Sequence, residues 1–167
     1  MATQRGFTIL EILVVVAVIS IITSTILLNT NFNRPEETLK QHSKKISKTL
    51  KLLMQEAILN DNNYALSLFP GGYIVLEFNG EEWLPSEDKF LLSLKGQYTF
   101  SDELIIDSQI IKIEKKDKPD PHILILASGE MTPFEWHISD REHDLNVVIK
   151  ANLLGDISSE GPAVSLP

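Results

Sequence analysis

Gly6-Phe7-Thr8-Ile9-Leu10-Glu11 opens the stretch of sequence that decides the fold, and an apolar run follows it to Leu28. Residues 7–28 are 22 residues that carry a single charge, Glu11. As a helix that rises 1.5 Å per residue they would span about 33 Å, enough to cross a bilayer core of about 30 Å. A carboxylate inside such a segment is costly unless it pairs or becomes protonated, so acids there are usually functional. The sequence therefore predicts a transmembrane helix over 7–28 in which Glu11 has a role.

The segment from Gly6 to Glu11 and the apolar run behind it resemble the processing motif of type IV pilins and type II secretion pseudopilins. The resemblance implies that residues 1–6 are a leader, that a membrane prepilin peptidase cuts after Gly6, and that the same enzyme N-methylates Phe7. It also implies that Glu11 pairs with the terminal ammonium of a neighbouring subunit. Losing one partner of a buried ion pair costs roughly 3–5 kcal/mol, so the pair would set the register between subunits. A plain signal anchor without a role for Glu11 is the alternative.

Charge is distributed unevenly along the 167 residues. The whole chain has 15 Lys and Arg against 23 Asp and Glu, a net charge of -8. Residues 34–56 carry six basic and three acidic side chains, whereas residues 57–167 carry 8 and 19, a net of -11. Such an acidic chain is a poor candidate for binding nucleic acid, and no nucleic acid is expected as a partner. The absence of cysteine excludes disulfides, thiolate metal sites and cysteine nucleophiles.

Two observations disagree on topology. Only Arg5 precedes the apolar run, whereas several basic residues follow it closely: Arg34, Lys40, Lys44, Lys45 and Lys48. By the positive-inside rule this count favours a cytoplasmic C-terminal domain, but long domains can translocate despite their charge. The resemblance implies a single-pass protein of the bacterial inner membrane with a periplasmic C-terminal domain. We expect that arrangement, against the Lys and Arg count.

A second helix is expected after a break or kink over 29–35. Proline followed by acids, Pro35-Glu36-Glu37, is typical of a helix start, and a helix is predicted over 36–60. Its apolar residues recur on one face at helical spacing: Leu39, Ile46, Leu50, Leu53 and Ala57. We expect this face to pack on the protein's own sheet, and a coiled coil with a partner is the alternative.

From residue 64 the pattern changes to short strands, and a β domain is predicted over 64–154. Pro70-Gly71-Gly72 and Asn79-Gly80 indicate turns. The predicted strands are Tyr64–Phe69, Tyr73–Phe78, Glu82–Leu84, Phe90–Lys95, Tyr98–Phe100, Leu104–Ile113, Ile123–Ala127, Phe134–Ser139 and Leu145–Ala151. The tail over 155–167, rich in Ser, Gly and Pro, is predicted to be loose. The expected fold is α+β: a pilin-like long N-terminal helix, half membrane-spanning and half amphipathic, packed on an antiparallel sheet or sandwich.

The segment from Leu124 to Phe134, with Ser128-Gly129 and Thr132-Pro133-Phe134, is similar to one in H-type minor pseudopilins of type II secretion, the GspH/FimT family. Asn79–Trp83 resembles that family's hairpin before a tryptophan. The resemblance implies a subunit assembled near the tip of the pseudopilus that helps to export folded proteins. The implied partners are the major and other minor pseudopilins, the prepilin peptidase, the inner-membrane assembly platform and membrane lipid.

The domain offers no convincing catalytic constellation. A metal cluster could be drawn from His137, Asp140, Glu142 and His143, but their spacing matches no standard zinc signature and favours a solvated acidic turn. We therefore predict no metal, no cofactor and no enzyme activity. Two alternatives stay open: a minor pilin of a type IV pilus or DNA-uptake system, and a membrane-anchored periplasmic enzyme that uses His137 or Asp140.

Overall fold

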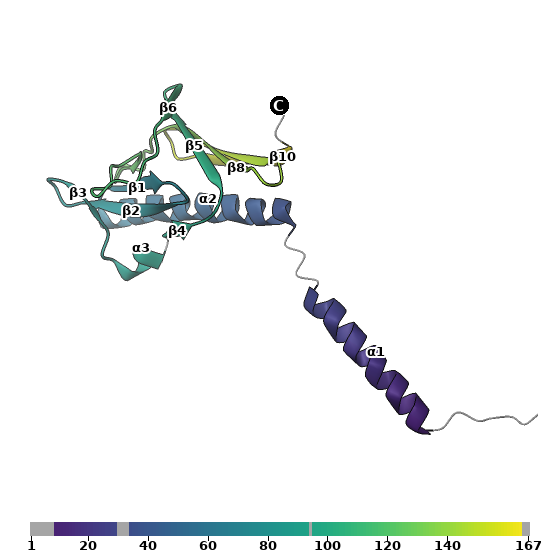
Figure 1. Cartoon of the computed structure of the whole chain (residues 1–167). Coiled ribbons are helices and arrows are strands. Elements are labelled where there is room, and N and C mark those ends of the chain that lie inside the picture. The colour runs from purple at the N-terminus through teal and green to yellow at the C-terminus, as the bar shows by residue number, and fades with distance from the viewer. Residues whose placement is uncertain (1–8, 30–33, 94, 165–167) are drawn as a thin grey trace, which may run out of the picture. The chain divides into compact units, whose positions relative to one another are not determined.

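A computed structural model describes residues 9–29, 34–93 and 95–164 of the chain (Figure 1). The chain divides into two compact units, Met1–Arg34 and Pro35–Pro167. The first unit contains helix α1, Ile9–Asn29. In the part of the chain that is described, no helix combines the length and apolarity needed to cross a membrane.

Helix α2, Pro35–Asn60, is the long helix of the second unit. Proline occupies its first position, where the missing N–H is not needed, and Glu36 and Glu37 lie in the first turn near the positive end of the helix dipole. The helix ends where Asp61 takes a positive φ of 49°, and the Asn62 N–H donates to the Ala57 carbonyl over 3.1 Å. The buried face holds the five predicted apolar residues together with Ser43 and Thr49.

The first sheet is antiparallel and lies in the middle of the sequence. It comprises β1 Tyr64–Phe69, β2 Gly72–Phe78, β3 Trp83–Pro85, β4 Gly96–Gln97 and β7 Ile123–Ile125. The strand order is β3-β2-β1-β7, and β4 pairs with β2. Pro70-Gly71 forms the two-residue turn between β1 and β2, and Gly71 has the φ of +80° that a type II turn needs at its second central position. The predicted Asn79-Gly80 hairpin is a four-residue loop, because Phe78 pairs with Trp83.

The second sheet is also antiparallel, in the order β10-β9-β8-β5-β6. Its strands are β5 Ser101–Ile106, β6 Gln109–Ile111, β8 Phe134–Asp140, β9 Leu145–Ala151 and β10 Ile157–Val164. Along β8 the residues Phe134, Trp136 and Ile138 are buried, and those between them are half-buried. This alternation turns one face of the sheet toward the core and the other toward solvent.

Helix α2 joins the two sheets through one core. It contacts β7 of the first sheet and β8, β9 and β10 of the second. The largest fully buried side chains include Trp136, Tyr73, Leu50 and Leu66, which come from α2 and both sheets. The predicted α+β class, with a helix packed on antiparallel sheets, is confirmed.

Three local predictions of strand structure were wrong. Phe90–Lys95 contains the short helix α3, Lys89–Ser93, which begins because the Asp88 carboxylate accepts hydrogen bonds from the N–H groups of Phe90 (2.7 Å) and Leu91 (3.3 Å). The long strand predicted over 104–113 is a hairpin, since Asp107 and Ser108 both take positive φ and turn the chain back. Residues 98–100 form no strand and instead cross from one sheet to the other.

The C-terminal tail is the remaining correction. Instead of being loose, Ile157–Val164 forms β10 and pairs with β9 along its length, with an irregularity between Glu160 and Ala163. Gly161 and Pro162 fall in that irregularity, where a missing N–H breaks no regular ladder, and β10 is an edge strand. The composition that predicted a loose tail is therefore compatible with an edge strand, and the β domain extends to Val164.

Candidate assembly site

The residues expected to carry assembly lie at the N-terminus. Gly6 and Phe7 fall outside the described residues. Glu11 lies in the first turn of α1 with its side chain exposed, near the end of the helix where a carboxylate interacts favourably with the dipole. The structure thus places Glu11 at the start of an apolar helix, as the sequence predicts.

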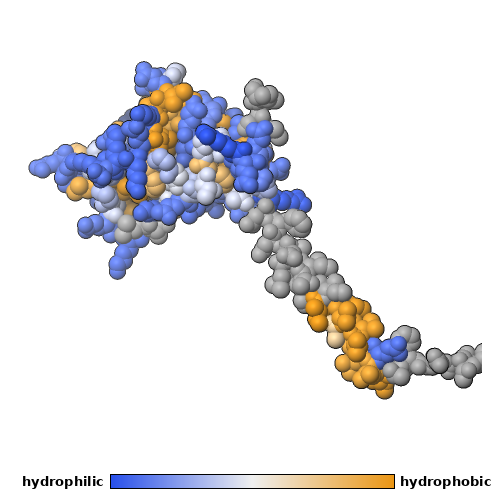
Figure 2. Space-filling model, viewed as in Figure 1, coloured by the Kyte–Doolittle hydropathy of each residue, from blue (hydrophilic) through white to orange (hydrophobic). Residues whose placement is uncertain are grey.

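Apart from Glu11 and Ser20, the described side chains of α1, residues 9–21, are apolar or small and are exposed, and Figure 2 shows apolar residues on the face in view. Ile9 is 84% exposed, Leu10 75% and Leu13 66%. Exposed aliphatic side chains in such number are unfavourable in water, so a helix of this kind is normally buried against other apolar groups. Ile9, Ile12, Leu13, Val16 and Ala17 share one side of the helix, and helical geometry places Glu11 on roughly the opposite side. The described part of α1 therefore presents an apolar surface that favours burial against apolar surroundings.

Of the four residues considered as a metal cluster, only His143 and Asp140 form an ion pair with each other among the described residues. The Nδ1 atom of His143 lies 2.9 Å from Oδ2 of Asp140, whereas Nε2 of His137 lies 3.5 Å from Oε2 of Glu135 on the same strand. Desolvation is the largest single influence on Asp140 and opposes its ionisation, but hydrogen bonds from His143 and Glu142 and the charge of His143 together outweigh it and hold the Asp140 pKa below its usual range. No group of three or more His, Asp or Glu side chains suited to a metal occurs in the described residues.

The sequence did not predict a polar cluster that Asp102 forms with Tyr98 and Trp136. Oδ1 of Asp102 accepts two hydrogen bonds of 2.8 Å, one from the Tyr98 hydroxyl and one from Nε1 of Trp136. Desolvation raises the pKa of Asp102 to about 6, although both hydrogen bonds oppose this shift. These hydrogen bonds connect Tyr98, in the segment between the two sheets, and Asp102 to Trp136 in the core. No local sequence pattern indicates that Asp102 is half-buried.

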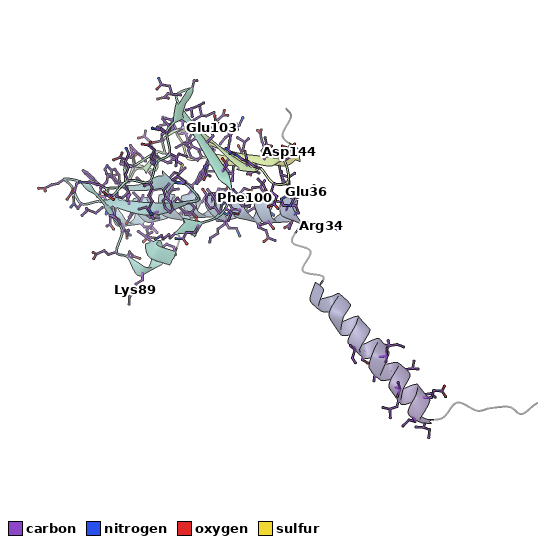
Figure 3. All side chains as sticks on the ribbon, viewed as in Figure 1. Arg34, Glu36, Lys89, Phe100, Glu103 and Asp144 are labelled. Atoms are coloured by element: carbon purple, nitrogen blue, oxygen red, sulfur yellow. The ribbon has the colours of Figure 1, made fainter. Side chains whose placement is uncertain are left out.

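His42 of α2 completes this cluster. Its ring lies 4.1 Å from the Tyr98 ring and 5.3 Å from the Phe100 ring, centroid to centroid, and Figure 3 shows Phe100 beside α2. Burial, with a smaller contribution from the charge of Lys45, lowers the pKa of His42 to about 4. The aromatic contacts hold the 96–100 segment across α2, which is a structural role.

Comparison with known proteins defines first a class and then a family. The family model described as the prokaryotic N-terminal methylation motif matches residues 1–27. The fold is similar to the minor pseudopilin EpsH from the type 2 secretion system of Vibrio cholerae, with a TM-score of 0.58, 20% identity, and coverage of 74% of this chain and 97% of that one. It is also similar to the solution structure of Escherichia coli GspH, with a TM-score of 0.61, 12% identity, and coverage of 83% and 99%. Fold and motif together are those of a pilin-like protein.

The sequence comparison identifies the family. The chain is 30% identical over 148 residues to type II secretion system protein H of Pseudomonas aeruginosa. The matched region covers 84% of this chain and 86% of the relative. The protein of the same name from Escherichia coli K12 is 25% identical over 139 residues, 80% of each chain. The chain belongs to the GspH family of minor pseudopilins of type II secretion. These are structural subunits and not enzymes, and their prepilin motif implies anchoring in the inner membrane, processing by prepilin peptidase and partners in the pseudopilus.

Proposed function

We propose that this minor pseudopilin is cut after Gly6, methylated on Phe7 and assembled near the tip of the type II secretion pseudopilus, where it helps to export folded proteins. The observation that carries the proposal is the methylation motif over 1–27 in a chain that is 30% identical to a type II secretion protein H. Both curated relatives bear that name, which favours secretion over a type IV pilus or DNA-uptake system.

In this proposal the chain has a leader over 1–6 and a helix over 7–28 that serves as membrane anchor and then as filament core. The connection over 29–35, the helix over 36–60 and the β domain lie in the periplasm. The exposed apolar surface of α1 supports the two roles of the first helix, because it needs burial in either surrounding. The partners are the major and other minor pseudopilins, the prepilin peptidase, the assembly platform and membrane lipid.

Glu11 receives the role of charge partner. Cleavage after Gly6 creates an ammonium on Phe7, and the Glu11 carboxylate of a neighbouring subunit neutralises it inside the helix bundle. Buried charges persist only when they are paired, so a subunit in the wrong register would leave both groups without a partner. The exposed position of Glu11 in the first turn of α1 suits an intersubunit contact.

The mass of the N-terminal peptide, taken from protein purified from its native membrane, tests the processing. The expected chain begins at Phe7 and carries one additional methyl group on its amino terminus. A chain that begins at Met1 or Ala2, in cells whose other prepilins are processed, contradicts the proposal and leaves a plain signal anchor. The Gly6→Leu variant provides the control, because a bulky residue before the cut should leave the leader in place.

The Glu11→Gln variant tests the charge pair separately from processing. Glutamine keeps the size of the side chain but removes its charge. We expect normal cleavage after Gly6 and loss of incorporation into the pseudopilus, because the neighbouring ammonium loses a partner worth roughly 3–5 kcal/mol. Cross-linking to the neighbouring pseudopilins measures incorporation. Normal cross-linking of Glu11→Gln would remove the assigned role while leaving the family and the processing intact.

A further inference from the structure

The solvent side of α2 carries a stripe of lysines. Lys40, Lys44, Lys48 and Lys51 are all exposed, and at 100° per residue they fall within an arc of roughly 80°. This arc faces away from the buried face formed by Leu39 and the apolar residues after it. We call these four residues the lysine face. It is a continuous basic surface on a domain that is otherwise acidic.

Among the described residues, no carboxylate lies within ion-pair distance of the lysine face. By contrast, several lysines of the β domain each lie beside a carboxylate: Lys112, Lys116, Lys118 and Lys150. The only acid in the same arc is Glu37, at the start of the helix, where Gln41 donates to its carboxylate over 3.2 Å. The lysine face is therefore available to an external anion.

Exposed apolar residues continue this surface at the C-terminal end of α2. Ile58 is 52% exposed and Leu59 is 78% exposed. Two more exposed leucines, Leu153 and Leu154, precede Gly155, which lies against Met54 of α2. A basic stripe with adjoining exposed aliphatic residues is the composition that adsorbs to a lipid interface, where lysines meet the headgroups and apolar side chains enter the acyl boundary.

We propose that the lysine face docks α2 on the anionic phospholipid headgroups of the membrane that anchors α1, and so holds the subunit flat on the membrane before it enters the filament. The chain itself favours a lipid over a protein partner. Only residues 30–34 separate the end of α1 from the start of α2, a link that cannot extend beyond about 22 Å. Tethered so closely, α2 meets the headgroups at a high effective concentration. Each lysine near an anionic surface strengthens adsorption roughly fivefold.

The acidity of the β domain does not prevent this docking. An α-helix with its side chains is about 10–12 Å thick, whereas the Debye length at physiological ionic strength is about 8 Å. Because the sheets pack on the far side of α2, a membrane in contact with the lysine face would lie more than a Debye length from much of the acidic surface. The proposal also accounts for the basic residues that follow the apolar run, since neutralisation by headgroups is compatible with either side of the membrane.

The test uses the full chain in lipid nanodiscs, and the absence of natural cysteine makes single labels specific. A fluorophore is placed at Gln55→Cys, on the solvent side of α2, or at Gln109→Cys, on the exposed strand β6. Quenching by iodide is compared in discs of phosphatidylcholine alone and in discs with one quarter phosphatidylglycerol. We expect quenching at position 55 to fall at least fivefold when the anionic lipid is present, to recover in 0.5 M salt, and to stay constant at position 109.

Two quadruple variants separate the lysine face from net charge. K40Q/K44Q/K48Q/K51Q removes the face, and K112Q/K115Q/K116Q/K118Q removes the same charge from an exposed loop of the β domain. We expect only the first variant to lose the protection of position 55. Equal quenching in the two lipids, or equal loss in both variants, overturns the proposal. Protection that arises only when neighbouring pseudopilins are added to neutral discs assigns the face to a protein and also overturns it.

The proposal rests on the proposed function only in requiring that α1 is anchored in a membrane. Recovery of the chain with the discs measures this anchoring directly. Processing after Gly6 is measured by the N-terminal mass, and assembly is measured by cross-linking. A failure of lipid docking with intact anchoring and processing therefore contradicts the role of the lysine face alone.

Discussion

Asp102 and His42 are half-buried ionisable residues whose pKa values are strongly shifted by desolvation. Oδ2 of Asp102 and Nε2 of His42 are buried and have no hydrogen-bond partner among the described residues. Desolvation therefore favours the neutral form of each side chain, which raises the pKa of the acid to about 6 and lowers that of the base to about 4. Two ionisable groups that pack around Tyr98 thus respond to pH in opposite senses.

Separate replacement of these residues should reveal two opposite pH profiles. In Asp102→Asn, His42 remains, and its folded pKa lies below the unfolded value of 6.5. The stabilisation that neutral His42 contributes to the free energy of unfolding is fully present above pH 6.5 and is lost as the pH falls toward 4. In His42→Phe, Asp102 remains, and its folded pKa lies above the unfolded value of 3.8. The folded state then holds the proton more tightly, so stability falls as the pH rises from 4 through 6.

Urea unfolding between pH 4 and 7 measures both effects against the unmodified chain, in which they largely cancel. Each effect should amount to about 2 kcal/mol, less than the full conversion of the pKa shifts because both side chains are only partly buried. Lys45 and Tyr73, which also influence this cluster, are unchanged in both variants. Parallel pH profiles for the two variants would contradict the assignment.

At the scale of elements, the edge strand β10 differs from the prediction, because its Ser, Gly and Pro content predicted a loose tail. Its pairing with β9 extends from Ile157 to Val164, and it also contacts α2, where the hydroxyls of Ser159 and Ser43 lie 3.4 Å apart. Ile157 packs against the core as well. The strand therefore covers both an edge of the second sheet and part of α2, and it contributes to stability despite its Gly and Pro.

Deletion of residues 156–167 should therefore destabilise the domain. The deletion removes the β10 ladder and leaves β9 as an edge with unpaired backbone groups, so we expect a loss of at least about 2 kcal/mol in the free energy of unfolding together with self-association. Urea unfolding and size-exclusion chromatography measure the two effects. Deletion of residues 165–167 alone is the matched control, and it should change neither. An unaltered unfolding midpoint after the longer deletion would mean that β10 adds no stability.

At the scale of the whole molecule, the chain separates a helix with an exposed apolar surface from a domain with its own core. Every buried hydrophobic residue of the described chain lies between Leu39 and Ile149, inside the second unit. The described part of the first unit has no buried hydrophobic residue, and its apolar side chains are exposed on α1 (Figure 2). This division is compatible with the proposed function, in which the domain keeps its fold while the helix is buried first in the membrane and then in the filament.

The fragment 35–167 should consequently fold alone. We expect one cooperative unfolding transition, with a midpoint that matches that of the domain in the full chain in detergent, because no core residue is removed. Fluorescence of the two tryptophans reports on it, since Trp136 is fully buried and Trp83 is half-buried. A fragment that unfolds gradually, or only at much lower urea, would show that residues 1–34 contribute to the stability of the domain.

The parts of the fold that could be predicted have local signals. The face of α2 follows from the spacing of Leu39, Ile46 and Leu50, and the turn at Pro70-Gly71 follows from the backbone preferences of these two residues. The α3 segment lacks such a signal, because a short apolar run fits a helix and a strand equally well. There the Asp88 carboxylate decided the outcome by capping the first turn. The partners of Asp102 come from β8 and from the 96–100 connection, so the spacing of nearby residues could not reveal them.

The sequence by itself determined the N-terminal motif from Gly6 to Glu11, the apolar helix behind it and the helical face that packs on the sheets. These features depend on residue type and spacing within one segment, where the backbone period alone sets which side chains share a face. Only the tertiary structure decided that the tail is a strand, that Asp102 is half-buried and that the four lysines of the lysine face form no ion pair among the described residues. Those features depend on which distant segments come together, because pairing, desolvation and ion contacts are properties of the assembled core and surface.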